Sequence, residues 1–262
     1  MDRGKIDFIA HNVKYLGVAG IAVILDKTVI FVDPYPVIDR GTLERMTGGR
    51  GGIGSVDIFI SHGHYDHYEY VMKTIEHLNG FFAIRVFLPD DIYARDAAIL
   101  SKAGASVQSF SRYKKGIESD EYRTEAVEGI HMRIGFLFKI SRIFRIFHMN
   151  ELRRHFSNPS KQTVNLMFTI LRNNLRIGHV GSPALNAAAI ECLKGVDLVC
   201  LAMMPSIRKN LAHIEKLMPA YCMPIHHINR INGIYLLDNY DMRKLKNILG
   251  DRFMEMGVYS CD

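Results

Sequence analysis

The sequence predicts an α/β protein, and two observations point to that class. Short apolar runs typical of buried strands recur from Ile21 to Val258, and segments with helical periodicity separate them. The chain has 262 residues, 48% of them hydrophobic, which is enough to bury a substantial core. We therefore expect one α/β domain over residues 1–262, although length alone would also allow two domains.

The expected elements follow one another along the whole chain. Apolar runs of strand character are, in order, Leu16–Leu25, Val29–Val32, Val56–Ile60, Asn165–Ile170, Leu175–Val180 and Met223–Ile225. Helical patterns are expected over Tyr68–Asn79, Asp90–Ala103, Ala184–Leu193, Leu211–Leu217 and Asp241–Leu249. This alternation is typical of sheets covered by helices.

Four potential metal ligands lie within six residues directly after the apolar run Val56–Ile60. They are His62, His64, Asp66 and His67. In an extended segment, residues two apart project to the same side, so His62 and His64 can bind one cation together. If a helix begins near Tyr68, Asp66 and His67 are presented toward a second position. Neutral imidazole and carboxylate suit zinc, iron and manganese, so the spacing predicts a metal site.

A structural role for the same residues is the alternative. Asp66, followed three residues later by Glu69, would also serve as a helix N-cap with a capping-box partner. Three histidines and an aspartate at this spacing have few packing explanations, however. We therefore favour the metal site.

The motif His-x-His-x-Asp-His after an apolar strand resembles the signature of the metallo-β-lactamase superfamily. The segments Asp33-Pro34-Tyr35, His179-Val180-Gly181-Ser182 and Met223-Pro224-Ile225-His226 resemble other parts of that family in order and character. The chain resembles the stand-alone hydrolases of the family, which include the ascorbate 6-phosphate lactonase group. The resemblance implies a four-layer αββα sandwich, with two mixed sheets inside and helices outside.

The resemblance also implies the ligand set. It assigns His62, His64 and His155 to one metal, and Asp66, His67 and His226 to the other. His148 is an alternative to His155; spacing favours His155, which lies ten residues before Asn165.

Ser182 stands where the family has a shared aspartate after a glycine. A serine hydroxyl is a neutral, weak ligand, so the expected site lacks one negative charge and one bridge between two cations. The sequence therefore predicts either a single ion or a loosely held second one.

Asp33 ends an apolar strand just before Pro34, where an unpaired carboxylate would be costly to bury. We expect it either to accept a hydrogen bond from a ligand histidine, as carboxylates beside metal sites commonly do, or simply to begin a turn. If Asp33 contacts a ligand histidine, it supports the metal site without binding the metal itself, as is expected of Ser182.

A cation held mainly by histidines is a strong Lewis acid, and it brings the pKa of bound water toward ~7. The expected enzyme is a metal-dependent hydrolase of a small anionic substrate such as a lactone, ester or phosphodiester, with a hydroxide formed at the metal as the nucleophile. Asp66 is the candidate catalytic residue, which orients that nucleophile or accepts its proton. Zinc is the first expected cofactor, as one or two ions, with manganese or iron as alternatives.

Two other functions remain open from the sequence. One is a phosphodiesterase acting on nucleic acid or phospholipid, since relatives with a similar motif act on both. The other is a non-catalytic descendant that binds metal or serves as a scaffold, an alternative that Ser182 supports. Oligomeric state cannot be read from the sequence.

Charge and cysteine content bear on partners and location. The net charge of +6 favours anionic partners without naming one. Basic and aromatic residues alternate over Arg133–Arg154, a pattern compatible with nucleic acid or a membrane surface but better explained by a sheet with one solvated face.

The chain begins without an apolar signal segment, so we expect a cytoplasmic protein. Four cysteines without a CxxC pair lie in apolar surroundings and are expected to be reduced and buried: Cys192, Cys200, Cys222 and Cys261.

Overall fold

The structure is a computed structural model of the chain. It describes residues 2–130, 162–182, 184–203, 207–225, 228–229, 234–235 and 239–259. Three of the residues singled out by the sequence, His148, His155 and His226, lie outside this part. The segment Arg133–Arg154 and Cys261 also lie outside it.

The first sheet has six strands in sequence order, β1 to β6. Neighbours from β1 to β3 are antiparallel, and neighbours from β3 to β6 are parallel. The strands are β1 Val13–Gly17, β2 Gly20–Ile24, β3 Thr28–Val32, β4 Ser55–Phe59, β5 Ala83–Leu88 and β6 Ala105–Ser109.

The second sheet repeats this pattern with six later strands, in the order β12-β11-β10-β9-β8-β7. Neighbours from β7 to β10 are antiparallel, and neighbours from β10 to β12 are parallel. The strands are β7 Ile117–Glu118, β8 Tyr122–Gly129, β9 Thr163–Ile170, β10 Leu175–Val180, β11 Leu198–Ala202 and β12 Tyr221–Ile225. A short hairpin pairs β13 Ile228–Asn229 with β14 Ile234–Tyr235.

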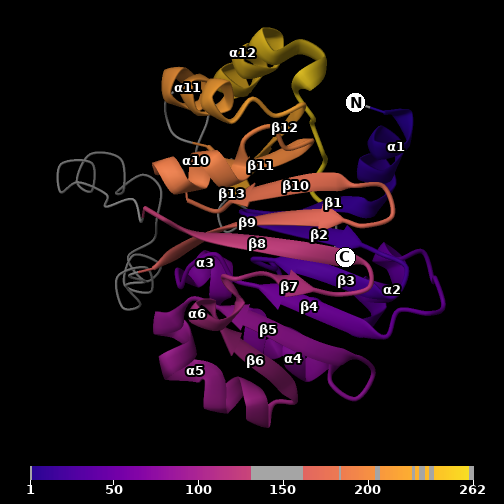
Figure 1. Ribbon diagram of the computed structural model, residues 1–262. Helices are drawn as coiled ribbons and strands as arrows, with labels where there is room; N and C mark the ends of the chain where they lie inside the picture. The colour runs from indigo at the N-terminus through magenta and orange to yellow at the C-terminus, as the bar shows by residue number, and fades with distance from the viewer. Residues whose placement is uncertain are drawn as a thin grey trace.

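Helices cover the outer faces of the stacked sheets, with α10, α11 and α12 on one side and α4 and α5 on the other (Figure 1). Their apolar residues form two separate outer clusters, one against each sheet. The helices are α1 Arg3–Asn12, α2 Arg40–Met46, α3 Tyr65–Tyr68, α4 Val71–Leu78, α5 Asp90–Lys102, α6 Phe110–Tyr113, α10 Ala187–Leu193, α11 Ile207–Leu217, α12 Asn239–Leu249 and the 3-10 turn η1 Gly250–Arg252.

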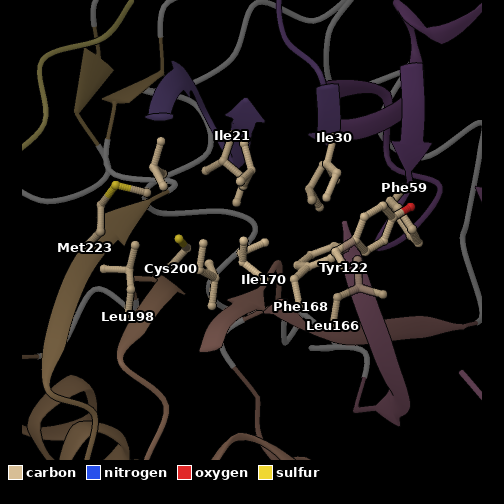
Figure 2. Packing of buried hydrophobic residues seen from close by; sticks show 14 of the residues in the cluster. Ile21, Ile30, Phe59, Tyr122, Leu166, Phe168, Ile170, Leu198, Cys200 and Met223 are labelled. Atoms are coloured by element: carbon tan, nitrogen blue, oxygen red, sulfur yellow. The ribbon is translucent and has the colours of Figure 1, made fainter. Parts of the chain in front are cut away.

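The largest apolar cluster lies between the two sheets and receives side chains from both (Figure 2). Phe59 of β4 packs edge to face on Phe168 of β9, with ring centroids 5.1 Å apart. Tyr122 of β8 reaches across this layer, and its hydroxyl donates to the fully buried carboxylate of Asp57 on β4. Arg85 of β5 binds the same carboxylate through two hydrogen bonds of 2.6 Å.

The predicted four-layer αββα sandwich is confirmed. The apolar run Leu16–Leu25 contains parts of β1 and β2, because the chain turns between Gly17 and Gly20, and β2 pairs antiparallel with β3. The helix predicted over Tyr68–Asn79 is two helices, α3 and α4. The sequence reading missed α1, where apolar and charged residues mix without a clear stripe, and α2, which is only seven residues long.

Two further observations concern membranes and thiols. Among the described residues, none of the helices combines the length and apolar character needed to cross a bilayer. Cys192, Cys200 and Cys222 are free thiols, and the latter two are buried. The expectation of buried cysteines holds for Cys200 and Cys222, whereas Cys192 is only partly buried.

Candidate metal centre

The motif lies at one edge of the first sheet, where parallel strands end. Strand β3 ends at Val32 and is followed by Asp33, while the parallel neighbour β4 ends at Phe59 and leads to Ser61. Parallel strands present their carboxyl ends at the same edge, which brings these two side chains together. The second sheet reaches the same place, because the backbone N–H of Val164 donates to the carbonyl of Ser61 at 2.8 Å.

Asp33 is fully buried and accepts three hydrogen bonds. Its Oδ1 accepts from the Ser61 backbone N–H at 2.7 Å. Its Oδ2 accepts from the Ser61 hydroxyl at 2.5 Å and from Nδ1 of His67 at 2.8 Å. Three donors and no exposed surface make this carboxylate an organising group for its neighbours, and one of the donors is the motif histidine His67.

These contacts determine which imidazole nitrogens carry lone pairs. His67 donates its Nδ1–H to the carboxylate, so its Nε2 is the lone-pair nitrogen. The single hydroxyl proton of Ser61 is donated to Asp33. In the 3.0 Å contact between Ser61 and His62, the Nδ1–H of His62 is therefore the donor. The Nε2 atom of His62 therefore carries a lone pair as well.

The four motif side chains come together as two pairs. Nε2 of His62 lies 3.1 Å from Nδ1 of His64, and this is the His62–His64 pair. Nε2 of His67 lies 3.9 Å from Oδ1 of Asp66, and this is the Asp66–His67 pair. The pairs are adjacent, since the rings of His62 and His67 have centroids 3.8 Å apart.

The four motif side chains are imidazole and carboxylate groups, which are ligand types that zinc, manganese and iron accept. Nε2 of His62 and Nδ1 of His64 are within hydrogen-bond distance of each other, at 3.1 Å. The Asp33–His67 contact is the carboxylate–imidazole arrangement that commonly orients metal ligands. Among the described residues, no group of three or more His, Cys, Asp and Glu side chains is close enough to hold an ion. Each pair therefore needs further ligands, and the two expected ones, His155 and His226, lie outside the described residues.

Asp66 does not cap a helix in the way the structural alternative required. It lies within α3, which begins at Tyr65, and the cap position of α4 is Tyr70. The helix thus begins three residues earlier than the sequence suggested. This short helix turns Asp66 and His67 toward each other after the extended His62–His64 segment.

Ser182 lies at the end of β10 and is almost fully buried. Its Oγ donates to the carbonyl of Ile130 at 3.3 Å. The preceding Gly181 lies directly against the site, since a Cβ at that position would sit 2.2 Å from Oγ of Ser61 and 3.1 Å from Oδ2 of Asp33. The chain that follows β10 therefore lies beside the Asp33 network.

The sequence reading missed two residues of this network, Ser61 and His179. Ser61 links Asp33 to His62, as described above. His179 is fully buried, donates from Nε2 to the carbonyl of Ala19 at 2.9 Å, and lies 3.9 Å from Oδ2 of Asp33. A signal for each was present: Ser61 directly precedes the motif, and His179 is a histidine inside an apolar strand.

Electrostatics around the motif reflect the buried carboxylates. Burial lowers the pKa of His67, but the charges of Asp33 and Asp66 outweigh it and leave the pKa above its ordinary value. Tyr35 packs edge to face on Tyr70 with centroids 5.1 Å apart. Burial, the neighbouring Tyr70 and the charge of Asp66 raise the pKa of Tyr35, so its hydroxyl keeps its proton at neutral pH.

Comparison with known proteins identifies the fold. Neither the protein-family models nor the curated proteins include a match to this sequence. Solved structures do match. Igni18, a metallo hydrolase from the archaeon Ignicoccus hospitalis, is 15% identical with a TM-score of 0.63, and 95% of each chain is covered. The metallo-β-lactamase fold protein YhfI from Bacillus subtilis is 9% identical with a TM-score of 0.58, covering 94% of this chain and 95% of that one. This chain has the metallo-β-lactamase fold.

A third neighbour extends the comparison. A possible metal-dependent hydrolase from Veillonella parvula is 10% identical with a TM-score of 0.62, covering 95% of this chain and 97% of its own. Structural neighbours described as a metallo hydrolase and as a possible metal-dependent hydrolase thus match almost the full chain. At such low identity the likeness concerns the fold, so the roles of individual residues must be argued from the geometry above.

Proposed function

We propose that the chain is a metal-dependent hydrolase of a small, anionic substrate such as a lactone, an ester or a phosphodiester. The observation that carries the proposal is the convergence of His62 and His64, whose facing nitrogens are 3.1 Å apart, beside the Asp66–His67 pair. A metallo-β-lactamase fold shared with metal-dependent hydrolases supports it.

The ligands in this proposal are His62, His64, Asp66 and His67, completed by His155 and His226. When bound, zinc, or manganese or iron in its place, would act as a Lewis acid that activates water and stabilises negative charge on the substrate. Asp33 and Ser61 would hold the imidazoles of His67 and His62 in the required tautomers.

Asp66 is the proposed catalytic residue. Its side chain is 14% exposed, so it is accessible to water while lying next to His67. A carboxylate in this position would orient the attacking water and accept its proton. Tyr35, which keeps its proton at neutral pH, lies near enough to Asp66 to feel its charge and would line the same side of the site.

An anionic substrate is proposed because of the chain's charge. A net charge of +6 favours the approach of anions, although it identifies none. The resemblance to the ascorbate 6-phosphate lactonase group points to phosphorylated lactones as the first substrates to test. The proposal includes one domain over residues 1–262 and a cytoplasmic location, for which the reduced cysteines are the supporting sequence feature.

The experiment has two arms. Metal content is measured after reconstitution with zinc, manganese or iron, for the wild type and for the double variant His62→Ala/His64→Ala. His77→Ala, an exposed histidine on α4, is the matched control. We expect one to two equivalents of metal in the wild type and the control, and a loss in the double variant. A wild-type protein that binds none of these metals would refute the proposal.

The second arm assays the reconstituted enzyme against lactones, carboxylic esters and bis(4-nitrophenyl) phosphate. Turnover of lactones or esters supports the leading proposal. Turnover of the phosphodiester alone, with salt-sensitive binding of nucleic acid or phospholipid, would favour the phosphodiesterase alternative. Metal binding without turnover of any substrate class would favour the scaffold alternative.

A further inference from the structure

We infer that the side of the sandwich between β1 and β12 is a docking site for an extended segment, and that a second copy of this chain can supply that segment. Residues 253–259 of the chain itself occupy the site in this structure. We call these residues the closing segment, and the edges of β1 and β12 that they cover the seam. The inference is independent of the proposed function, because none of the proposed metal ligands belongs to the seam or to the closing segment.

The closing segment joins the edge strands of the two sheets. β1 and β12 each stand first in the strand order of their sheet, so each has one edge without a neighbour among the described strands of that sheet. Phe253 forms a parallel bridge with Cys222 of β12, and Val258 forms one with Tyr15 of β1. In Figure 1 the yellow chain that follows α12 runs past β12 toward β1. The segment therefore covers two edges that could otherwise pair with another chain.

Side chains of the closing segment alternate as they do in a strand. Met254, Met256 and Val258 pack on the apolar cluster between the sheets. Glu255 and Gly257, which lie between them in sequence, are exposed. This period of two shows that the seam accepts an extended segment with apolar side chains at every second position.

The ends of the closing segment reach the outer layers of the molecule. Phe253 packs on the cluster outside the second sheet, and Tyr259 packs on the cluster outside the first. Seven residues thus contact all three apolar clusters, and their fit to the seam is seen directly. A second copy carries the same seven residues, so its closing segment matches the seam equally well.

Few backbone contacts hold the closing segment in place. The N–H of Met254 donates to the carbonyl of Cys222 at 2.9 Å, and the N–H of Tyr259 donates to the carbonyl of Tyr15 at 2.7 Å. The side chains that point inward are only partly buried. Segments with few buried contacts open at a lower free energy than the strands of the core. Opening of this segment frees the seam for the segment of another copy.

The chain before the closing segment is fixed, which determines where an exchange would begin. Arg252 donates from Nη2 to the carbonyl of Pro219 at 3.1 Å, so the exchange begins after this residue. A short tether gives the chain's own segment an effective concentration of about 1 mM, so a second copy competes only as the protein approaches that concentration. Two copies that each donate a segment to the other form a closed, symmetric dimer.

Hydrogen exchange of the wild type tests whether the closing segment opens independently of the core. The amides of Met254 and Tyr259 should exchange at least about tenfold faster than the hydrogen-bonded amides of β2, a strand with neighbours on both sides. Equal protection would overturn the inference, because the segment would then open only when the whole protein unfolds.

A peptide with the sequence of residues 251–259 tests the docking site. Met256→Glu weakens the closing segment by placing a charge in the apolar layer, and it leaves the seam itself unchanged. Gly257→Glu is the matched control, because it adds the same charge one residue later, where nothing lies within 4 Å of a Cβ. By fluorescence anisotropy, Met256→Glu should bind the labelled peptide at least about tenfold more tightly than the wild type or the control does. Equal binding by all three overturns the docking site.

Two further measurements accompany the peptide assay. A peptide that carries the Met256→Glu change should bind to none of the proteins, and binding equal to that of the native peptide would overturn the proposed role of the apolar side chains. Met256→Gln, which has a similar length and no charge, replaces Met256→Glu if thermal unfolding shows that the charged variant does not fold. It should still bind the native peptide more tightly than the wild type does.

Analytical ultracentrifugation of the full chain between about 10 μM and about 1 mM tests the second copy as the partner. We expect a dimer fraction that rises with concentration in the wild type and in Gly257→Glu, and a smaller one in Met256→Glu, whose segment fits no seam. A wild type that stays monomeric throughout, or a dimer that is equally abundant in Met256→Glu, overturns this assignment. Neither result affects the metal-dependent function, which is tested separately by metal content.

Discussion

Nδ1 of His67 lies 2.8 Å from Oδ2 of Asp33, and both side chains are fully buried. Asp33 follows β3, and His67 lies in α3 beyond β4, so the contact joins two connections at the edge of the first sheet. Asp33 also has a backbone φ of 47°, a left-handed conformation that is uncommon for residues other than glycine. Strained backbone of this kind is often found where a side chain must be placed for function.

Gly181→Ala should damage the metal centre. The added Cβ would lie 2.2 Å from Oγ of Ser61, which would push Ser61 away from Asp33 and His62. We expect weaker metal binding and a loss of about 1–3 kcal/mol in the free energy of unfolding, as for other overpacked sites. Gly54→Ala is the control, because nothing lies within 4 Å of a Cβ there. Metal titration and denaturant unfolding of both variants check the prediction, and equal behaviour would contradict it.

Tyr122→Phe should destabilise the protein more than Tyr113→Phe does. The hydroxyl of Tyr122 donates to the buried carboxylate of Asp57, whereas the buried hydroxyl of Tyr113 has no hydrogen-bond partner among the described residues. Removing one donor from a buried carboxylate costs about 1–3 kcal/mol. Removing an unpaired hydroxyl of the same residue type should cost less or stabilise the fold. Thermal unfolding of the two variants side by side measures the difference.

The sequence was sufficient to predict the α/β class and the motif, because both depend on local patterns. The layered arrangement followed from the family resemblance. The apolar run Val56–Ile60 and the alternating ligands after it need only strand geometry to be read. It was not sufficient to place Ser61 and His179, whose contacts are with Asp33 and Ala19, far away in the chain. Pairings of this kind depend on which strands become neighbours, and single-residue patterns do not contain that information.

Helix boundaries were the other weak point, for a physical reason. The pattern over Tyr68–Asn79 looked continuous, but α3 ends at Tyr68 and α4 begins at Val71. The break lets α3 orient Asp66 and His67 independently of the amphipathic helix that follows. A requirement of the site therefore outweighs the local preference for a single helix.

Cys192 and Cys222 should react slowly with thiol reagents in the native protein. Burial raises the pKa of the Cys192 thiol to about 11 and that of Cys222 to about 12, so the reactive thiolate is scarce at pH 8. The labelling rate should rise as the pH approaches these values, since the thiolate forms only then. Peptide mapping by mass spectrometry after timed labelling identifies each site, with unfolded protein as the reference. Fast labelling of native Cys222 at pH 8 would contradict the prediction.

Ser182→Asp should change how the protein depends on metal. The Ser182 hydroxyl donates to the carbonyl of Ile130. An aspartate carboxylate has no proton to donate, so without metal its oxygens would face the carbonyl oxygen and lower the free energy of unfolding. With metal present, the added negative charge should favour a second ion beside the His62–His64 pair. We therefore expect a larger rise in Tm on adding zinc than the wild type shows, together with a higher metal content per chain after reconstitution.

Ser182→Asn is the control for this substitution, because it has nearly the same size and shape without the charge. If the two variants respond to metal equally, the effect is steric, and the missing charge at position 182 is not what weakens the binding of a second ion.

The same two variants also distinguish an enzyme from a scaffold. In an active hydrolase, Ser182→Asp should alter the rate on the substrate found in the assay panel. A scaffold should bind the extra ion and remain inactive, because filling a metal position cannot create a substrate site that the surrounding residues do not provide.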